Sequence, residues 1–317
     1  MQVIRAGWGK LIGVDMEPYR VELTGYCYRM LGSGFEAEDA VQETFVRAWK
    51  SYDESRASLR TWLYRIATNV CLDMLRSVQR RALAMDLGPA SKPGGGMGAV
   101  VPDERWIHPV PDRLVLTEDT VVQRETIRLA FVAALQHLPP KQRAVLILRD
   151  VLCWSADEVA GLLETTVASV NSALQRSRAT LRDRASNGGA PGEPWRPDDP
   201  VQRELLRRYC AAFERHDVDT LVSLLHEDAT TSMPPLLWWF RGRDDIEQAL
   251  RAPQASCEGA RLVPVRANGS PAFWQTRPGP DGAHVPFALM IFDVRDGAVT
   301  GIVTYLGADR WLPVFPL

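Results

Sequence analysis

The chain has 317 residues, of which 46% are hydrophobic and 24% are charged, and its formal net charge is −2. These values are typical of a soluble globular protein with two or three domains, and they exclude overall positive charge as an argument for nucleic-acid binding. The sequence lacks an apolar run of about 18 residues and a basic-then-apolar start, so we expect a cytoplasmic protein without a membrane partner.

Cysteine usage and local charge narrow the possibilities further. The five cysteines stand singly, without Cys-x-x-Cys pairs or zinc-finger histidine spacing, so we expect reduced thiols and neither a metal nor another cofactor. Residues 60–81 hold five Arg against one Asp, and residues 167–184 hold four Arg against one Asp. From residue 198 onward 12 Arg face 16 acidic residues, so any nucleic-acid contact belongs to the earlier part of the chain.

The first clear element is an amphipathic helix over residues 36–50. Its apolar stripe consists of Val41, Phe45, Ala48 and Trp49. Asp39, Gln42 and Glu43 share another face, because they are three or four residues apart. An acidic stripe in an otherwise basic domain suggests a basic protein partner, although a solvated helix face is the alternative.

A second helix, over residues 59–76, is followed by a basic tail. Its apolar residues, Trp62 included, are expected to form core. The remaining polar and basic residues can reach nucleic acid through stacking, hydrogen bonds and phosphate contacts. These candidate DNA-binding residues are Tyr64, Arg65, Asn69, Arg76, Arg80 and Arg81.

Residues 83–112 are rich in Pro and Gly and show no sustained periodicity. The cluster Pro93-Gly94-Gly95-Gly96 lacks the Lys-Ser or Lys-Thr that completes a phosphate-binding loop. We therefore expect a flexible linker over residues 83–117, and about 30 residues of such a coil span roughly 30 Å.

Residues 155–184 predict a helix-turn-helix. Ser155 and Glu158 form a capping box, Glu164-Thr165-Thr166 turns the chain, and either Thr can cap the next helix. The polar face of that helix can hydrogen-bond base edges and phosphates, because it is rich in Ser, Asn, Gln and Arg. These candidate DNA-binding residues are Ser169, Asn171, Ser172, Gln175, Arg176 and Arg178.

Three motifs, in this order, make the chain resemble the bacterial RNA polymerase sigma factors of the extracytoplasmic-function type. The first is Glu38-Asp-Ala-Val-Gln-Glu-Thr-Phe45, which is similar to the core-polymerase-binding helix. The second is Thr61-Trp-Leu-Tyr-Arg-Ile-Ala-Thr-Asn69, which is similar to the helix that opens and reads the −10 element. The third, Leu138-Pro-Pro-Lys-Gln-Arg-Ala-Val-Leu146, leads into the helix-turn-helix that reads the −35 element in the family.

The resemblance implies a partner for each residue set. Asp39, Gln42 and Glu43 would face the clamp helices of the largest subunit of RNA polymerase core. Asn69 and the stretch 76–81 would handle the −10 strand of promoter DNA, and Ser169–Arg178 would read the −35 duplex. An anti-sigma factor or a small ligand is a further candidate partner. The sequence departs from the family at Glu164, a turn position where relatives commonly have Gly.

The end of the linker, Trp106-Ile-His-Pro-Val-Pro-Asp112, resembles the subgroup of the family with an added C-terminal domain. Residues 200–317 in turn resemble the SnoaL-like (nuclear transport factor 2-like) α+β cone, with helices first and then strands at 261–267, 271–276, 285–295 and 298–306. Cones of this kind enclose a pocket, although the same aromatic residues can serve as packing. The candidate lining residues are Met233, Trp238, Trp239, Phe240, Phe287 and Tyr305.

No catalytic residue is expected in the cone. His216 and Asp217 fall at a helix end, and His226 falls at the start of an expected loop, so all three are expected to cap helices or face solvent.

The expected fold is multidomain, with two all-α domains followed by an α+β cone. Sigma region 2 is expected at residues 15–82 and region 4 with the helix-turn-helix at 118–185. A second linker follows at 186–199, and the cone occupies 200–317.

The expected function is that of a non-enzymatic sigma factor that binds polymerase core and directs promoter-specific initiation, with the cone regulating it. One alternative is a helix-turn-helix regulator with a small-molecule-sensing cone that acts without polymerase; the acidic helix disfavours it. Another is an enzyme in the cone fused to a DNA-targeting module, which the lack of a convincing acid–base pair disfavours.

Overall fold

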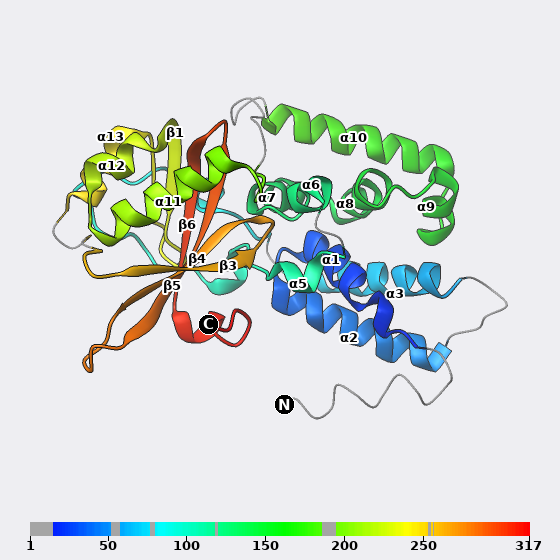
Figure 1. Cartoon of the computed structure of the whole chain (residues 1–317). Helices are drawn as coiled ribbons and strands as arrows, with labels where there is room; N and C mark the ends of the chain where they lie inside the picture. The colour runs from blue at the N-terminus through cyan, green and yellow to red at the C-terminus, as the bar shows by residue number, and fades with distance from the viewer. Residues whose placement is uncertain are drawn as a thin grey trace. The chain divides into compact units, whose positions relative to one another are not determined.

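The computed structural model describes residues 15–51, 58–76, 80–117, 120–185, 195–252, 255 and 257–317. The chain divides into two compact units, each of which combines separated stretches of sequence (Figure 1). Unit 1 consists of residues 1–81 and 107–189, and unit 2 consists of residues 82–106 and 190–317. Most of the expected second linker lies outside the described residues.

Unit 1 is helical. Its first helical bundle consists of η1 (Glu17–Tyr19), α1 (Arg20–Leu31), α2 (Gly34–Ser51) and α3 (Leu59–Met74). The short helix α5 (Asp112–Val115) follows. The second helical bundle consists of α6 (Val121–Glu125), α7 (Leu129–Gln136), α8 (Pro140–Leu146), η3 (Ile147–Val151), α9 (Ala156–Leu162) and α10 (Val167–Ala185).

Local chemistry sets the helix ends of the first bundle. The backbone N–H of Gly32 donates to Tyr28 O over 2.8 Å, and Gly32 takes the left-handed conformation that ends α1. Ser58 begins α3, because its hydroxyl accepts the backbone N–H of Thr61 at 3.3 Å.

Unit 2 is a six-stranded sheet with helices, as the α+β expectation requires. The strand order is β2-β1-β6-β5-β4-β3; β1 and β6 are parallel and the other pairs are antiparallel. The strands are β1 (Leu225–Ser232), β2 (Trp239–Arg241), β3 (Arg261–Ala267), β4 (Ser270–Pro278), β5 (His284–Arg295) and β6 (Ala298–Leu306). The helices are α4 (Ala84–Leu87), η2 (Asp103–Arg105), α11 (Pro200–Glu214), α12 (Val218–Ser223), α13 (Arg243–Leu250) and α14 (Ala308–Trp311).

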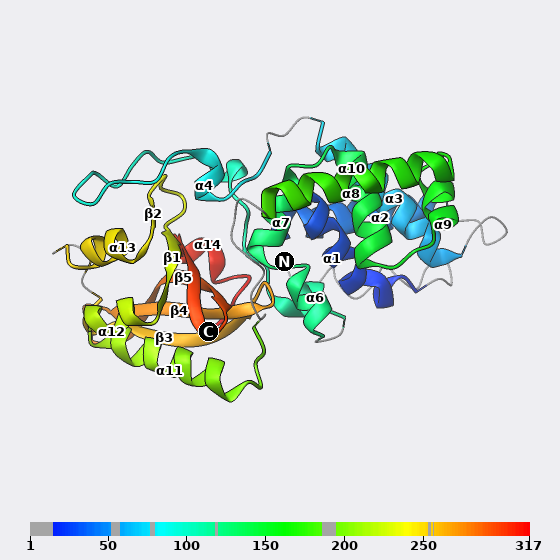
Figure 2. The same cartoon turned by 90° about the horizontal axis from the view of Figure 1, so that it is seen from above.

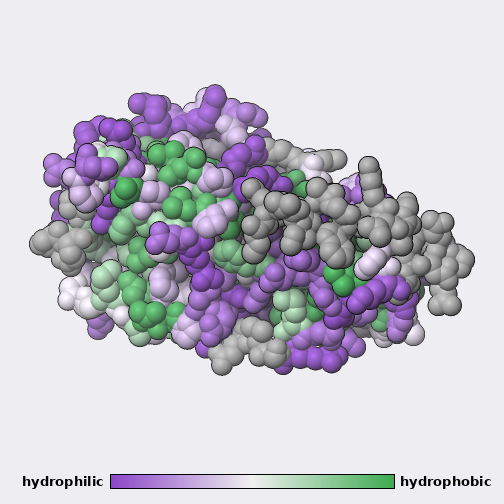
Figure 3. Space-filling view, turned by 90° about the horizontal axis from the view of Figure 1, so that it is seen from below, coloured by the Kyte–Doolittle hydropathy of each residue, from purple (hydrophilic) through white to green (hydrophobic). Residues whose placement is uncertain are grey.

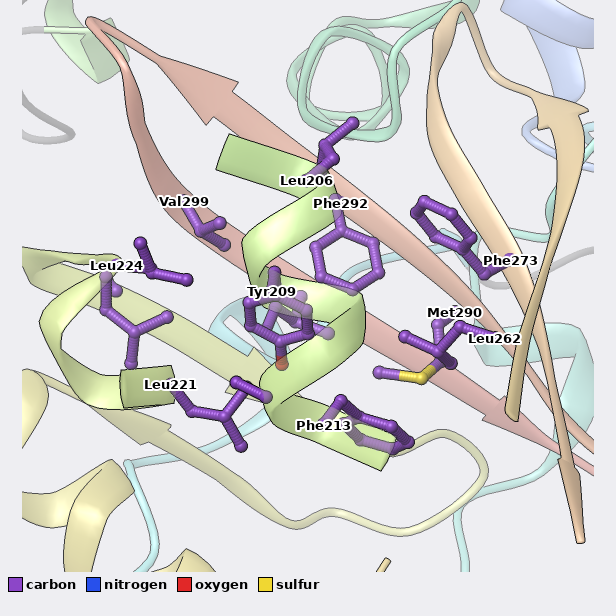
Figure 4. Close-up of a cluster of buried hydrophobic side chains, with 14 of the residues drawn as sticks. Leu206, Tyr209, Phe213, Leu221, Leu224, Leu262, Phe273, Met290, Phe292 and Val299 are labelled. Carbon is purple, nitrogen blue, oxygen red and sulfur yellow. The ribbon is translucent and has the colours of Figure 1, made fainter. Parts of the chain in front are cut away.

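The core of unit 2 lies between the sheet and the helices α11 and α12, which cover one of its faces (Figure 2). Figure 4 shows Tyr209 and Phe213 of α11 over Phe273, Met290 and Phe292 of the sheet. The ring centroids of Tyr209 and Phe292 are 4.9 Å apart in an edge-to-face arrangement. Large apolar side chains therefore fill the interior of this cone.

The C-terminal residues pack on side chains that alternate with the core-facing ones. Trp274 follows Phe273 in β4, and its indole N–H donates to the carbonyl of Phe315 over 2.9 Å. The ring of Tyr305 meets that of Trp311 in α14 with centroids 5.5 Å apart.

On the molecular face shown in Figure 3, hydrophobic residues occupy patches bordered by hydrophilic residues.

Residues 82–106 do not form the flexible coil expected from their Pro and Gly content. The backbone N–H groups of Ser91 and Val101 donate to the carbonyls of Trp239 (2.7 Å) and Pro235 (2.8 Å). The Trp239 indole N–H donates to Gly88 O at 3.1 Å, and its ring packs with Ala84 and Trp106. The physical reason is that scattered apolar residues and free backbone groups of this segment find partners in the cone.

At Gly98 the backbone of residues 82–106 lies very close to the backbone of Leu237. Gly98 has a φ of +72°, and a Cβ atom at this position would lie 2.2 Å from the carbonyl oxygen of Leu237. Glycine is required here both by the positive φ and by the contact.

Residues 107–117, the rest of the expected linker, pack on the first helical bundle instead. The backbone N–H of His108 donates to Gly32 O over 2.9 Å, and the Tyr28 hydroxyl donates to His108 O over 2.9 Å. Ile107 and Val110 are fully buried. The expectation of a flexible linker over residues 83–117 is therefore wrong. The part up to residue 106 packs on the cone, and the part from residue 107 packs on the first helical bundle.

The expected strands of the cone agree with β3 to β6 to within two residues at each end.

Asp217 caps α12, as expected, because its carboxylate accepts the backbone N–H of Thr220 at 3.1 Å. His226 lies in strand β1, so the expectation that it starts a loop is wrong. Its strand escapes sequence analysis because Leu225–Ser232 is mostly polar.

Candidate functional site

The acidic stripe of α2 lies on the surface of the first helical bundle. Asp39, Gln42 and Glu43 are all exposed, and Glu43 accepts a hydrogen bond from Arg47 Nε at 2.7 Å. Trp49, expected in the apolar stripe, is 37% exposed. The surface therefore combines carboxylates with apolar area, a combination found at protein interfaces.

The candidate DNA-binding residues of α3 differ in their accessibility. Asn69 is exposed, as is Arg76 in the following turn, whereas Arg65 is half-buried. Tyr64 is fully buried, and its ring lies 5.0 Å from that of Trp154. In this structure Tyr64 therefore offers no surface for stacking on a base.

The two arginines at the end of the basic tail also differ. Arg80 is exposed and lies 2.5 Å from His137 Nδ1 of the second bundle. Arg81 is buried, and its guanidinium pairs with Glu36 at 2.6 Å and contacts His108 Nε2 at 3.2 Å. Arg81 is therefore a buried structural residue here and is not placed to contact DNA.

The helix-turn-helix forms as its local signals indicate. Ser155 Oγ accepts the Glu158 backbone N–H, and Glu158 accepts the Ser155 N–H at 2.7 Å, which completes the capping box. The hydrogen bond from the Ser155 backbone N–H to the carboxylate is the largest cause of the lowered pKa of Glu158. Thr166 caps α10 by accepting the N–H of Ser169 at 3.1 Å. Glu164 has a φ of +52°, the left-handed conformation for which glycine is suited.

The polar face of α10 is exposed along its length. Arg178 makes a bidentate pair with Asp150, with distances of 2.8 and 2.6 Å. This pair joins α10 to η3. Arg176 is exposed and, two residues earlier, lies on a different side of the helix. The exposed candidate residues are Ser169, Asn171, Ser172, Gln175, Arg176 and Arg178.

The second helical bundle packs on α1 and α3, a contact that sequence analysis did not anticipate. Arg29 of α1 donates from Nη2 to Thr126 Oγ1 at 2.8 Å, and Gln136 of α7 donates to Arg29 O at 3.4 Å. Arg143 of α8 donates to Gln136 Oε1 at 2.6 Å and also to Met30 O. Burial lowers the pKa of both arginines to about 10.

The six aromatic and Met residues expected at a cone pocket are not brought together. Trp238 packs on Phe240 in the main core, with centroids 4.6 Å apart, while Trp239 packs on residues 82–106. Arg277 covers the Phe287 ring at 3.5 Å, and Tyr305 packs on Trp311. The backbone N–H of Met233 donates to Trp238 O at 3.2 Å.

Two further features bear on function. Within the described ranges, no group of three or more His, Cys, Asp or Glu side chains is arranged to hold a metal ion. No helix among the described residues has the length and apolar character to cross a membrane.

Comparison with known families assigns each part of the chain. Residues 16–81 match Sigma-70 region 2, residues 128–181 match Sigma-70 region 4, and residues 206–302 match the SnoaL-like domain. These matches cover α1 to α3, the helix-turn-helix and most of the cone.

Several known sigma factors align with most of the chain. The chain is 44% identical over 301 residues to the ECF RNA polymerase sigma factor SigG of Mycobacterium tuberculosis, covering 92% of this chain and 80% of SigG. It is 29% identical to SigJ of the same organism, over 94% of this chain and 92% of SigJ. The crystal structure of SigJ superposes with a TM-score of 0.63 at 25% identity, covering 94% of this chain and 98% of that chain. The chain belongs to the extracytoplasmic-function sigma factors, which direct promoter-specific initiation by RNA polymerase, and it carries a C-terminal SnoaL-like domain.

Proposed function

We propose that unit 1 makes both contacts on which this sigma factor depends: the exposed face of α2 binds the clamp helices of the largest polymerase subunit, and α3 and α10 bind promoter DNA. The observation that carries the first assignment is the joint exposure of Asp39, Gln42 and Glu43 within the region 2 match. Carboxylates on a protein surface favour a basic partner and disfavour DNA.

We expect Asp39→Arg to weaken association with RNA polymerase core by about tenfold or more, because it places a positive charge against a basic partner. The fold should survive, since the residue is exposed. The measurement is a titration of labelled protein with core polymerase. Asp244→Arg, the same change at an exposed position of α13, is the control. Equal affinity of the Asp39 variant and the control would contradict the assignment.

The −35 duplex is assigned to the exposed face of α10. Ser169, Asn171 and Ser172 lie near the start of the helix, which is the end that enters the major groove in a helix-turn-helix. Gln175 and Arg176 follow on the same face and can reach a base edge or a phosphate. For the −10 strand, Asn69, Arg76 and Arg80 are the exposed candidates.

Arg176→Ala is expected to lower the affinity for −35 DNA by about 1–3 kcal/mol, the range for a bidentate base contact. Competition binding with specific and unrelated duplexes at two salt concentrations measures it. A uniform loss for all sequences, with a shallower salt dependence, would identify a phosphate contact instead. Unchanged affinity at both salt concentrations would remove Arg176 from the interface.

For the cone we propose a regulatory, non-catalytic role. Two observations support it: aromatic and aliphatic side chains fill its interior, and it holds residues 82–106, which join the two DNA-binding bundles. A cone that holds this segment can influence how the bundles are presented to polymerase and promoter.

Reconstitution tests the proposed function as a whole. The purified chain is added to core polymerase, the promoters that it selects are sequenced, and run-off transcripts are measured. We expect initiation at promoters that share −10 and −35 elements. Sequence-specific DNA binding with no effect on polymerase would favour a regulator that acts without the enzyme.

A further inference from the structure

The turn of the helix-turn-helix reaches back to the first helical bundle. Glu164, in the left-handed position of that turn, forms an ion pair with Arg65 of α3. Next to this pair, Trp154 covers Tyr64, and the Arg60 guanidinium lies 5.2 Å from the Tyr64 centroid and 5.3 Å from that of Trp154. Of the residues that sequence analysis assigns to the −10 strand, Tyr64 is thus covered and Arg65 is paired by the module assigned to the −35 duplex.

We propose that Glu164 and Trp154 form an intramolecular lock that engages Arg65 and Tyr64, the two candidate −10 residues of α3 that are not exposed, and that must open before promoter DNA can reach them. The proposal rests on the assignment of α3 to the −10 strand made above. The Glu164 carboxylate holds Arg65 where a phosphate group of the DNA strand would otherwise pair with it.

The backbone at Glu164 supports a role for its side chain. A non-glycine residue at a φ of +52° costs conformational energy that a glycine avoids. Here the cost accompanies a carboxylate that reaches α3, and a glycine would lose that contact.

The interface also contains groups that favour its opening. Within the part of the chain that the structure describes, Tyr64 Oη, Trp154 Nε1 and Arg143 Nε are buried without a hydrogen-bond partner. Arg29 and Arg143 are buried cations whose polar partners here are carbonyl, hydroxyl and carboxamide oxygens. Opening would let water reach those of these groups that lie at the contact, which offsets part of the free energy gained on closing.

Glu164→Gly and Glu164→Gln separate the lock from the stability of the module. The glycine variant removes the carboxylate and relieves the backbone conformation, so the helix-turn-helix should remain folded. The glutamine variant keeps the side-chain shape and removes only the charge. Asp157→Asn, an exposed carboxylate of the same module, is the matched control.

The first readout is the distance between the two bundles in the free protein, measured by single-molecule energy transfer. Dyes are attached at Lys50→Cys and Ala179→Cys, both exposed, with Cys153 and Cys210 replaced by Ser. Because the Arg65–Glu164 pair is partly exposed, we expect both Glu164 variants to raise the ratio of open to closed molecules about two- to fivefold. Asp157→Asn should leave it unchanged. An unchanged ratio in both folded Glu164 variants would overturn the lock.

The second readout is binding of the free protein to a fluorescent single strand that carries the −10 sequence of a promoter selected in the reconstitution. Both Glu164 variants should bind it about two- to fivefold more tightly than the parent chain. The double variant Arg65→Glu with Glu164→Arg should restore the closed distance of the parent chain. It should not show the tighter strand binding of the single Glu164 variants. A changed distance with no strand binding by any chain would uphold the lock and refute the −10 assignment of α3. A double variant as open as Glu164→Gln would show that the ion pair does not hold the lock.

Discussion

Trp239→Ala should destabilise unit 2 by about 3–5 kcal/mol, the usual range for removing a buried tryptophan. Trp239 is 7% exposed, and the change empties the space between β2 and Trp106 and removes the hydrogen bond to Gly88. Residues 82–106 should therefore bind the cone much more weakly and detach from it more often. Hydrogen exchange at the amides of Ser91 and Val101 measures this, with an expected loss of protection of about 100-fold or more.

Trp238→Ala is the matched control, because it removes the neighbouring ring from the other cluster. Trp238 packs on Phe240 in the main core, whereas Trp239 belongs to the cluster with Ala84 and Trp106. The amides of Ser91 and Val101 should therefore stay better protected than in Trp239→Ala. Equal protection in the parent chain and in Trp239→Ala would refute the proposed anchoring by this side chain.

Truncation after Asn187 should free residues 82–106 altogether, because every strand of the cone lies beyond that point. Val101 and Trp106 would lose the surface on which they pack, and thermolysin should cut this segment far faster than in the full chain. Core binding should persist, since α2 and residues 107–117 belong to unit 1.

The same truncated chain tests regulation by the cone. Run-off transcription at equal core occupancy should differ between the two chains; a rise identifies the cone as an inhibitor and a fall identifies it as an activator. Identical output would contradict a regulatory role under those conditions.

Elements with strong local signals could be predicted from the sequence. The capping box at Ser155 and Glu158 needs only neighbouring residues, and it forms as expected. Strands β3 to β6 follow from short runs rich in apolar and β-branched residues and from turns such as Asp296-Gly297. Strand β1 escaped because its residues are mostly polar and its parallel partner, β6, lies about 70 residues further along.

Features that depend on distant partners could not be predicted. Arg81 was assigned to DNA because it ends a basic run, but it pairs with Glu36, 45 residues earlier. Residues 82–106 were expected to be a coil because their apolar residues are spaced irregularly, and their partners lie far along the chain. The sequence alone shows that Glu164 stands where relatives commonly have Gly. Its ion pair with Arg65, about 100 residues earlier, could not be predicted.

The position of residues 82–106 within unit 2 has a consequence for protein synthesis. Gly88 leaves the ribosome 151 residues before Trp239, to which it hydrogen-bonds. At about 5–20 residues per second, this interval lasts roughly 8–30 s. Both helical bundles are complete before the strands that bind the segment exist, so a newborn chain passes through a period in which it has its promoter-reading parts and not yet its cone. A cell that must keep this factor silent would need to restrain it during that interval by other means.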